Sequence, residues 1–169
     1  DLNAAIAGGG TILVCPGEYE GQFALTQNVE IIGTGSGDNP ATSTILIGVD
    51  GLGSTVPVTG AVTARLASLR ITGGNGAGTN SGGVYVNNGA ADVTIDDCAL
   101  VGNAGFYGGG VSVYTGELTI TNSDISNNTA SGSGGGIATA SLSTIESTTI
   151  TNNTTALSGE SYPKSHVIM

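Results

Sequence analysis

The chain has 169 residues, of which 9% are charged and 4% are aromatic, and its net charge is −10. Its 30 glycines argue against an ordinary helical protein, and its 38% hydrophobic fraction is too high for a disordered chain. The strong cations are Arg65, Arg70 and Lys164, too few for a nucleic-acid surface, and no apolar run is long enough for a membrane span. These features indicate a soluble all-β protein.

The chain opens with the one segment that favours a helix, residues 2–7, which three glycines at 8–10 would end. We expect residues 1–10 to form a helix and turn that cover the first coil of a repetitive β structure. The side chains expected to face inward are those of Leu2, Ala5 and Ile6.

An apolar strand follows at residues 11–15, and after it come Pro16-Gly17, Tyr19 and a second apolar stretch that ends in Ile31-Ile32-Gly33. This passage resembles the opening coil of the pectin-lyase-like right-handed parallel β-helix superfamily. The resemblance implies a right-handed β-helix with a lid helix at its N-terminal end.

Three later segments repeat at an interval of 25 residues and carry two columns of apolar residues. The columns are Ile95, Ile120 and Ile145, and Leu100, Ile125 and Ile150. Such a period in a strand-forming sequence predicts stacked coils. With the resemblance, it predicts an all-β, single-stranded right-handed parallel β-helix (β-solenoid) of about six coils over residues 11–155.

Glycines and asparagines recur in these repeats, as Gly-Gly-Val at 82–84, Gly-Gly-Gly-Val at 108–111 and Gly-Gly-Gly-Ile at 134–137. We expect the glycines at sharp turns with positive φ. The repeats resemble the Gly-Gly-Ala-Ile and Phe-x-x-Asn repeats of bacterial polymorphic outer-membrane proteins, a non-catalytic surface branch. We expect Asn103, Asn128 and Asn153 to stack as a hydrogen-bonded ladder at left-handed turns.

The two cysteines are predicted to be free thiols. Cys98 lies about three coils beyond Cys15, on the order of 14 Å along the axis, which is too far for a disulfide. In the repeat Cys98 aligns with Ser123 and Thr148, so it is interpreted as a small residue beside a turn.

After Thr155 the repeat stops, and residues 156–169 match none of the earlier units. We expect an irregular C-terminal tail. Because an uncapped last coil leaves an open edge, we also expect either continuation in a longer parent protein or end-to-end stacking on a partner.

An enzyme of this superfamily is the first functional alternative. The resemblance implies a polysaccharide lyase with a basic residue and calcium held by acidic residues, for which the candidates are Arg70, Asp96 and Asp97. The neighbours of Arg70 in register are Ala99 and then Asp124, and Asp96 and Asp97 cannot both point outward from one flat strand. We therefore expect no catalytic residue, cofactor or metal, with calcium only under the lyase alternative.

The remaining surface features favour binding or support. Tyr85 and Tyr114 could stack on sugar rings, which leaves a non-catalytic glycan-binding module as the second alternative. An ice-binding face at Thr94, Thr119 and Thr144 is a further hypothesis, but Asp96 and Glu146 interrupt it. Recognition is also expected in the loops at 34–43 and 74–81, where the repeat length varies.

The sequence thus predicts a structural or adhesive β-helix module of a secreted or cell-surface bacterial protein. We expect an extracellular location, and a polysaccharide or host cell-surface glycan as partner. Nucleic acid is not expected as a partner.

Overall fold

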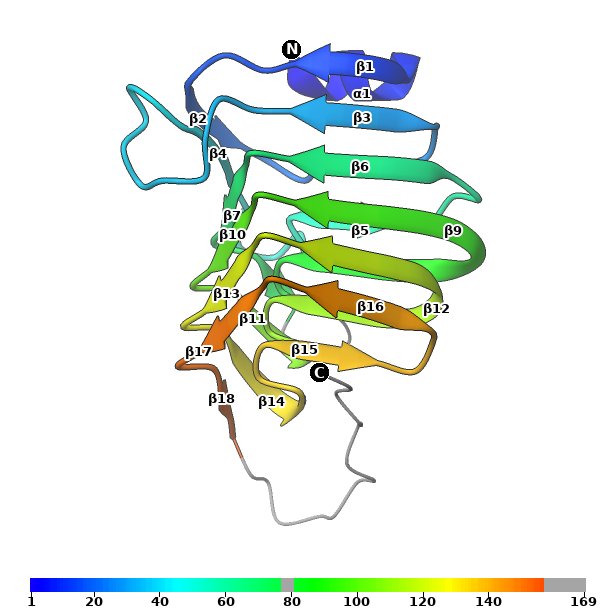
Figure 1. The fold of residues 1–169 in the computed structure, drawn as a ribbon, viewed down its shortest axis with the longest axis vertical. Helices are drawn as coiled ribbons and strands as arrows, with labels where there is room; N and C mark the ends of the chain where they lie inside the picture. The colour runs from blue at the N-terminus through cyan, green and yellow to red at the C-terminus, as the bar shows by residue number, and fades with distance from the viewer. Residues whose placement is uncertain (77–80, 157–169) are drawn as a thin grey trace.

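The computed structural model describes residues 1–76 and 81–156. The chain winds into a stack of coils, in which each coil lies on the one before it, and the helix α1 (Leu2–Gly8) lies across the N-terminal end (Figure 1). The strands pair in parallel, as a solenoid requires, and they form three sheets that run along the stack.

Helix α1 covers the first coil with Ile6, which is 2% exposed, and with the partly buried Leu2. Asp1 caps its N-terminus by accepting a hydrogen bond from the Asn3 backbone, and Gly9 ends it with a φ of 69°. The expectation for Ala5 was wrong, since this residue is exposed. Leu2 and Ile6 are four residues apart and so share one face of the helix, and this face is the one that packs on the coil.

The first sheet has eight strands, and its first strand lies next to α1 (Figure 1). One arm of it contains β1 (Gly10–Leu13), β3 (Val29–Ile32), β6 (Thr63–Ala67) and β16 (Ser143–Glu146). The other arm contains β5 (Val56–Val58) and β15 (Ile137–Thr139). Two long strands, β9 (Val84–Asp96) and β12 (Val111–Thr121), bend and join both arms (Figure 1).

The second sheet has six strands, and the third has four. The second contains β2 (Gly17–Glu20), β4 (Thr44–Ile47), β7 (Arg70–Thr72), β10 (Ala99–Val101), β13 (Asp124–Ser126) and β17 (Thr149–Thr151). The third contains β8 (Asn75–Gly76), β11 (Ala104–Tyr107), β14 (Thr129–Ser133) and β18 (Thr154–Thr155).

Strand register confirms the two apolar columns. Ile120 pairs with Ile95 on one side and with Ile145 on the other, and Leu100, Ile125 and Ile150 follow one another in the second sheet. The side chains of Ile95, Ile120, Leu100 and Ile125 are fully buried, whereas Ile150 in the last described coil is 37% exposed. The core is therefore a continuous stack of branched aliphatic side chains.

From β6 onward, the coils turn two of their corners with residues in the left-handed conformation. The corner after the first sheet uses Ser68, Asp97, Asn122 and Ser147, and the corner after the second uses Gly73, Gly102, Asn127 and Asn152. The ladder asparagines were expected to hold this conformation, but the residue before each of them does so instead. The ladder side chains are thereby free to point into the coil.

The asparagine ladder itself is confirmed. The Asn103 amide donates to Oδ1 of Asn128 at 3.1 Å, and the Asn128 amide donates to Oδ1 of Asn153 at 3.0 Å. The side-chain amides of Asn103, Asn128 and Asn153 also donate to backbone carbonyls of the preceding coil, at Ile71, Leu100 and Ile125 respectively. The ladder therefore satisfies buried backbone groups at one corner of successive coils.

The repeated glycine pairs have a different cause from the expected one. Positive φ occurs at Gly108 and Gly134, but at none of the glycine pairs that follow them or at Gly82 and Gly83. A Cβ on Gly109 would meet the carbonyl oxygen of Gly135 and would lie 2.6 Å from the Thr129 nitrogen. These glycines are therefore required because neighbouring backbones approach closely.

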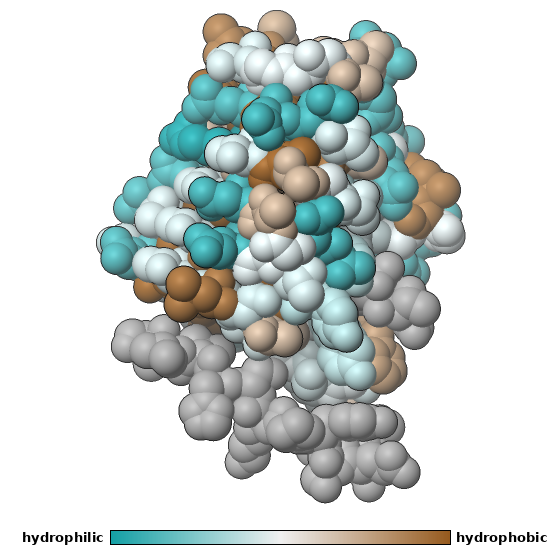
Figure 2. All heavy atoms as spheres, turned by 90° about the vertical axis from the view of Figure 1, so that its right-hand side faces the viewer, coloured by the Kyte–Doolittle hydropathy of each residue, from teal (hydrophilic) through white to brown (hydrophobic). Residues whose placement is uncertain are grey.

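The side on which β9 and β12 bend is mainly hydrophilic or neutral, and hydrophobic residues occur there in small separate patches (Figure 2). The part of the chain that the structure describes contains no helix long and apolar enough to cross a membrane. The tail expected at 156–169 lies outside the described residues from residue 157 onward.

Candidate functional site

The lyase candidates do not form one cluster. Arg70 is half-buried in β7 of the second sheet, where it pairs with Ala99, and the next residue in register is Asp124, as predicted. Asp96 ends β9 in the first sheet. Within residues 1–76 and 81–156, Arg70 makes no ion pair. The structure therefore does not bring the candidate base to the candidate carboxylates.

Asp96 and Asp97 occupy a corner, so the flat-strand argument does not apply to them. Asp97 follows the strand with a φ of 52°, and its exposed carboxylate accepts a hydrogen bond from the Ser68 hydroxyl at 2.8 Å. Both carboxylates thus lie on the outside of the coil. Asp96, however, is held by other partners.

Arg65 bridges Glu30 at 2.9 Å and Asp96 at 2.7 Å, and so links strands β3, β6 and β9. The hydroxyl of Thr121 and the amide of Asn122 also donate to Asp96, at 2.7 and 3.0 Å. These hydrogen bonds, chiefly that from Thr121, lower the pKa of Asp96, and Arg65 adds to the effect. Asp96 is therefore a structural acceptor with a weakened capacity to take up a proton.

The donor set does not fit a calcium site. Among the described residues, no three of the acidic, histidine or cysteine side chains come together closely enough to hold a metal ion. The single histidine, His166, lies outside the described residues. Both cysteines are free as predicted, and Cys15 is exposed whereas Cys98 is buried.

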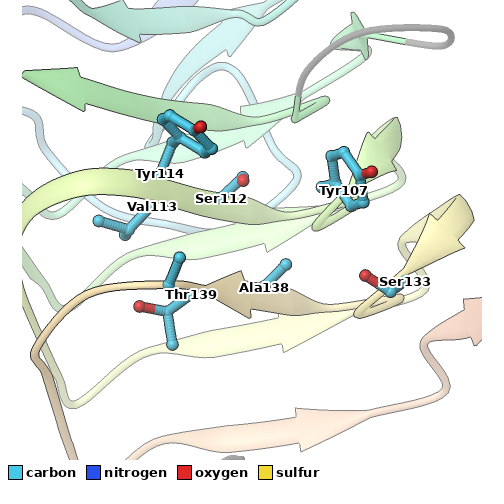
Figure 3. Close-up of a pocket in the computed structure, with 8 residues that line it drawn as sticks. Tyr107, Ser112, Val113, Tyr114, Ser133, Ala138 and Thr139 are labelled. Atoms are coloured by element: carbon cyan, nitrogen blue, oxygen red, sulfur yellow. The ribbon is translucent and has the colours of Figure 1, made fainter. Parts of the chain in front are cut away.

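A shallow pocket of about 220 Å³ lies on the outer surface where the third sheet meets the bent arm of the first. Its side chains come from β11, β12, β14 and β15 and from the residue that follows β15, and we call it the tyrosine pocket (Figure 3). The residues that line it are Tyr107, Ser112, Val113, Tyr114, Ser133, Ala138, Thr139 and Ala140.

Two small residues form the middle of the tyrosine pocket, and two tyrosines flank them. Ser112 and Ala138 pair in register on adjacent coils, and both are buried. Tyr107 and Tyr114 stand on opposite sides of these two residues (Figure 3). Tyr107 is 39% exposed and Tyr114 is 66% exposed, so both rings offer apolar surface to the solvent. The pocket has the form of a small floor between two aromatic walls.

The local chain explains how Tyr107 is aimed. The β11–β14 register shifts between Gly105 and Tyr107, and such irregularities re-aim side chains. The ring of Phe106 packs edge-on against that of Tyr107, with centroids 4.5 Å apart. A Cβ on Gly132 would lie 2.9 Å from the Phe106 ring, so glycine leaves the space that this ring fills.

The Ser112 hydroxyl is the central polar group of the tyrosine pocket. Ser112 is 5% exposed, and its hydroxyl makes no hydrogen bond with any described residue. In the same described part, no fully buried side-chain polar atom lacks a partner. Because the Ser112 oxygen has no partner, it is not one of the fully buried atoms and must be accessible to solvent. It is accessible from the pocket that Ser112 lines, where it can donate or accept one hydrogen bond.

The pocket carries no charged side chain, and a third tyrosine lies beside it. Tyr85 pairs in register with Ser112 on the preceding coil. Burial, with a further contribution from nearby Tyr114, raises the pKa of Tyr85, so this phenol stays neutral well above physiological pH. Tyr85 and Tyr114 were predicted as stacking residues, and the structure places them close together.

Sequence analysis missed Tyr107, Ser112 and the Arg65 bridge. The pairing of Tyr85 with Ser112 and of Ser112 with Ala138 spans 27 and 26 residues, so the 25-residue alignment does not place these three in one column. The signal available was the Phe106-Tyr107 pair before the glycines. This signal can be interpreted only once the geometry of the corner is known.

The other surfaces predicted from the sequence are a threonine column and two loops. Thr94, Thr119 and Thr144 stack in register on the first sheet, and Arg65 precedes them in the same column. The loop at 34–43 is mostly exposed between β3 and β4. Residues 77–80 of the loop expected at 74–81 lie outside the described residues.

No curated protein and no solved structure matches the chain significantly. The family model described as "right handed beta helix region" matches residues 59–168, which is more than half of the sequence. Together with the parallel coils, this match confirms the expected place in the pectin-lyase-like superfamily: the chain belongs to the right-handed β-helix family.

Proposed function

We propose that this chain is a non-catalytic adhesive module of a secreted or cell-surface bacterial protein, and that it binds glycan at the tyrosine pocket. One observation carries the proposal: Tyr107 and Tyr114 expose their rings on either side of a small floor that holds a free hydroxyl. Aromatic faces flanking a hydrogen-bonding floor suit the apolar faces and hydroxyl edges of a sugar ring.

The rigid scaffold supports an adhesive role. Tyr107 pairs in register with Ser133 of β14. Tyr114 lies at a register irregularity of β12, between the paired residues Val113 and Thr115, and its carbonyl accepts a hydrogen bond from the Ser141 hydroxyl. The backbone on either side of both tyrosines is thus held by neighbouring strands and need not be ordered when a ligand binds, so less of the contact energy is lost.

The arrangement of polar groups favours binding over catalysis. A lyase of this fold requires a base beside the carbon that loses a proton, within hydrogen-bonding reach. Arg70 lies in the second sheet and the tyrosine pocket is built from the other two sheets, while Asp96 is engaged by Arg65. We therefore expect adhesion without turnover.

A glycan array with labelled protein tests this proposal, and Tyr114→Ala is the decisive variant. We expect the wild type to bind at least one class of glycan and Tyr114→Ala to lose most of that signal. Leu13→Ala is the matched control, because Leu13 is 77% exposed on β1 and does not line the pocket. An unchanged array signal for Tyr114→Ala would refute the location of the site.

The same glycans, and polygalacturonate with calcium, should then be incubated with the protein while absorbance from unsaturated products is recorded. We expect no product. Turnover that disappears in Arg70→Ala would replace the adhesive function with a lyase, and the absence of any array signal would remove the glycan-binding function.

A further inference from the structure

We infer that the tyrosine pocket selects an uncharged sugar ring, one ring at a time, and discriminates against uronic acids. This inference rests on the proposed glycan-binding function and adds the chemical class of the ligand. Three observations support it: the size of the pocket, the charge around it and the free Ser112 hydroxyl.

The size limits how much of a glycan the pocket can hold. Its volume of about 220 Å³ is below the range of roughly 300–1,000 Å³ that is usual for pockets that enclose drug-sized ligands. The pocket is also open to solvent, since the Tyr107 and Tyr114 side chains that flank it are exposed. It therefore fits a single monosaccharide unit, with the rest of a glycan lying outside.

The charge distribution disfavours an acidic ligand. No side chain that lines the pocket is basic. Arg65 is occupied by two carboxylates, and Arg70 lies in the second sheet. A carboxylate bound between two aromatic rings would lose hydration without gaining a cation, and the net charge of −10 would repel a polyanion at low salt.

The polar groups of the pocket match an uncharged ring instead. Four hydroxyl groups without a partner among the described residues line it, and each can donate as well as accept. They belong to Tyr107, Ser112, Tyr114 and Ser133. The Ser112 hydroxyl lies at the floor, so it is the one most shielded from competing water when a ring covers it.

The test uses pairs of methyl glycosides that differ only at carbon 6: methyl glucoside with methyl glucuronide, and methyl galactoside with methyl galacturonide. Saturation-transfer NMR titrations would measure their binding to the full chain. We expect millimolar binding of at least one neutral member and binding of its uronide about tenfold weaker, because the carboxylate would stay unpaired.

Two substitutions make the test specific. Ser112→Ala should weaken the neutral glycoside about three- to tenfold without changing the urea midpoint, because no protein group loses a partner. Thr119→Ala is the control, since Thr119 lies on the same strand outside the pocket. Ser133→Lys should introduce a cation at the pocket and strengthen binding of the uronide.

The outcomes separate the two proposals. If uronides bind as well as or better than neutral glycosides, and Tyr114→Ala removes this binding, the inference is wrong while the glycan-binding function holds. If the neutral glycoside binds but Ser112→Ala changes nothing, the assigned floor contact is wrong. If no glycoside binds and the array is silent, both proposals fail.

Discussion

Asn128→Ala should be among the most destabilising substitutions in this chain. Asn128 is completely buried in the middle of the asparagine ladder. Its Oδ1 accepts from the Asn103 backbone at 2.9 Å, and its Nδ2 donates to the Leu100 carbonyl at 2.8 Å. The alanine would leave the buried Asn103 N–H without a partner and would deprive the Leu100 carbonyl of one donor.

The magnitude follows from these losses. An unsatisfied buried N–H costs about 1–3 kcal/mol, and the lost carbonyl contact and the space left by the amide cost about 1 kcal/mol each. We therefore expect the free energy of unfolding to fall by about 3–5 kcal/mol, which is a large share of the roughly 5–15 kcal/mol of a typical domain.

Urea denaturation followed by circular dichroism would measure this loss. Asn127→Gly is the matched control, because Asn127 is exposed and its φ of 55° suits glycine. We expect the control to change stability by less than about 1 kcal/mol. If both variants unfold at the same urea concentration, the ladder is not the stabilising element that its hydrogen bonds indicate.

Three further predictions concern glycine packing, the thiols and the Arg65 bridge. Gly109→Ala should lower the free energy of unfolding by about 1–3 kcal/mol in the same urea assay, because its Cβ would meet the neighbouring coil. Gly89→Ala is the control and should be nearly neutral, because a Cβ there has open space around it. Equal effects of the two substitutions would contradict the close-approach explanation. Burial raises the pKa of Cys98 to about 12, so at pH 8 a thiol reagent should label one cysteine per native chain, the exposed Cys15, and two after denaturation; rapid labelling of both in the native state would show that Cys98 is accessible. Because the folded pKa of Asp96 is lowered from 3.8, its contribution to stability is complete above that value and is lost as the pH falls through the folded pKa. The stability difference between wild type and Asp96→Asn should therefore shrink as the pH is lowered below 3.8, and a gap that stays constant or widens would contradict this linkage.

The repeat made the core and the ladder predictable. The register of columns such as Ile95 and Ile120 can be predicted from the sequence, because the 25-residue period is constant over this half of each coil. Asn103, Asn128 and Asn153 were identified in the same way, since a recurring polar residue at one phase in a stack contacts its own copies. In a solenoid, constant spacing is equivalent to spatial contact.

The site was predictable only in part, because it lies where the period breaks. Tyr85 and Tyr114 were predicted as residues that could stack on sugar rings, but Tyr107 is aimed by a register shift that no sequence spacing reveals. The free hydroxyl of Ser112 became recognisable only once its neighbours were known. Arg65 pairs with Glu30, which lies in its own column, and with Asp96, which lies in the column of Ala67. Only the strand register shows that both carboxylates are within its reach.

The most direct test of the central claim is to map where a neutral sugar binds. A titration of the ¹⁵N-labelled chain with neutral methyl glycosides, followed by ¹H–¹⁵N correlation spectra, would locate the contact residue by residue. We predict that the largest shift changes occur at the amides of Ser112, Tyr114, Ala138 and Thr139. Shift changes centred on the loop at 34–43 or around Arg65, or none at millimolar sugar, would contradict the assignment of the tyrosine pocket as the binding site.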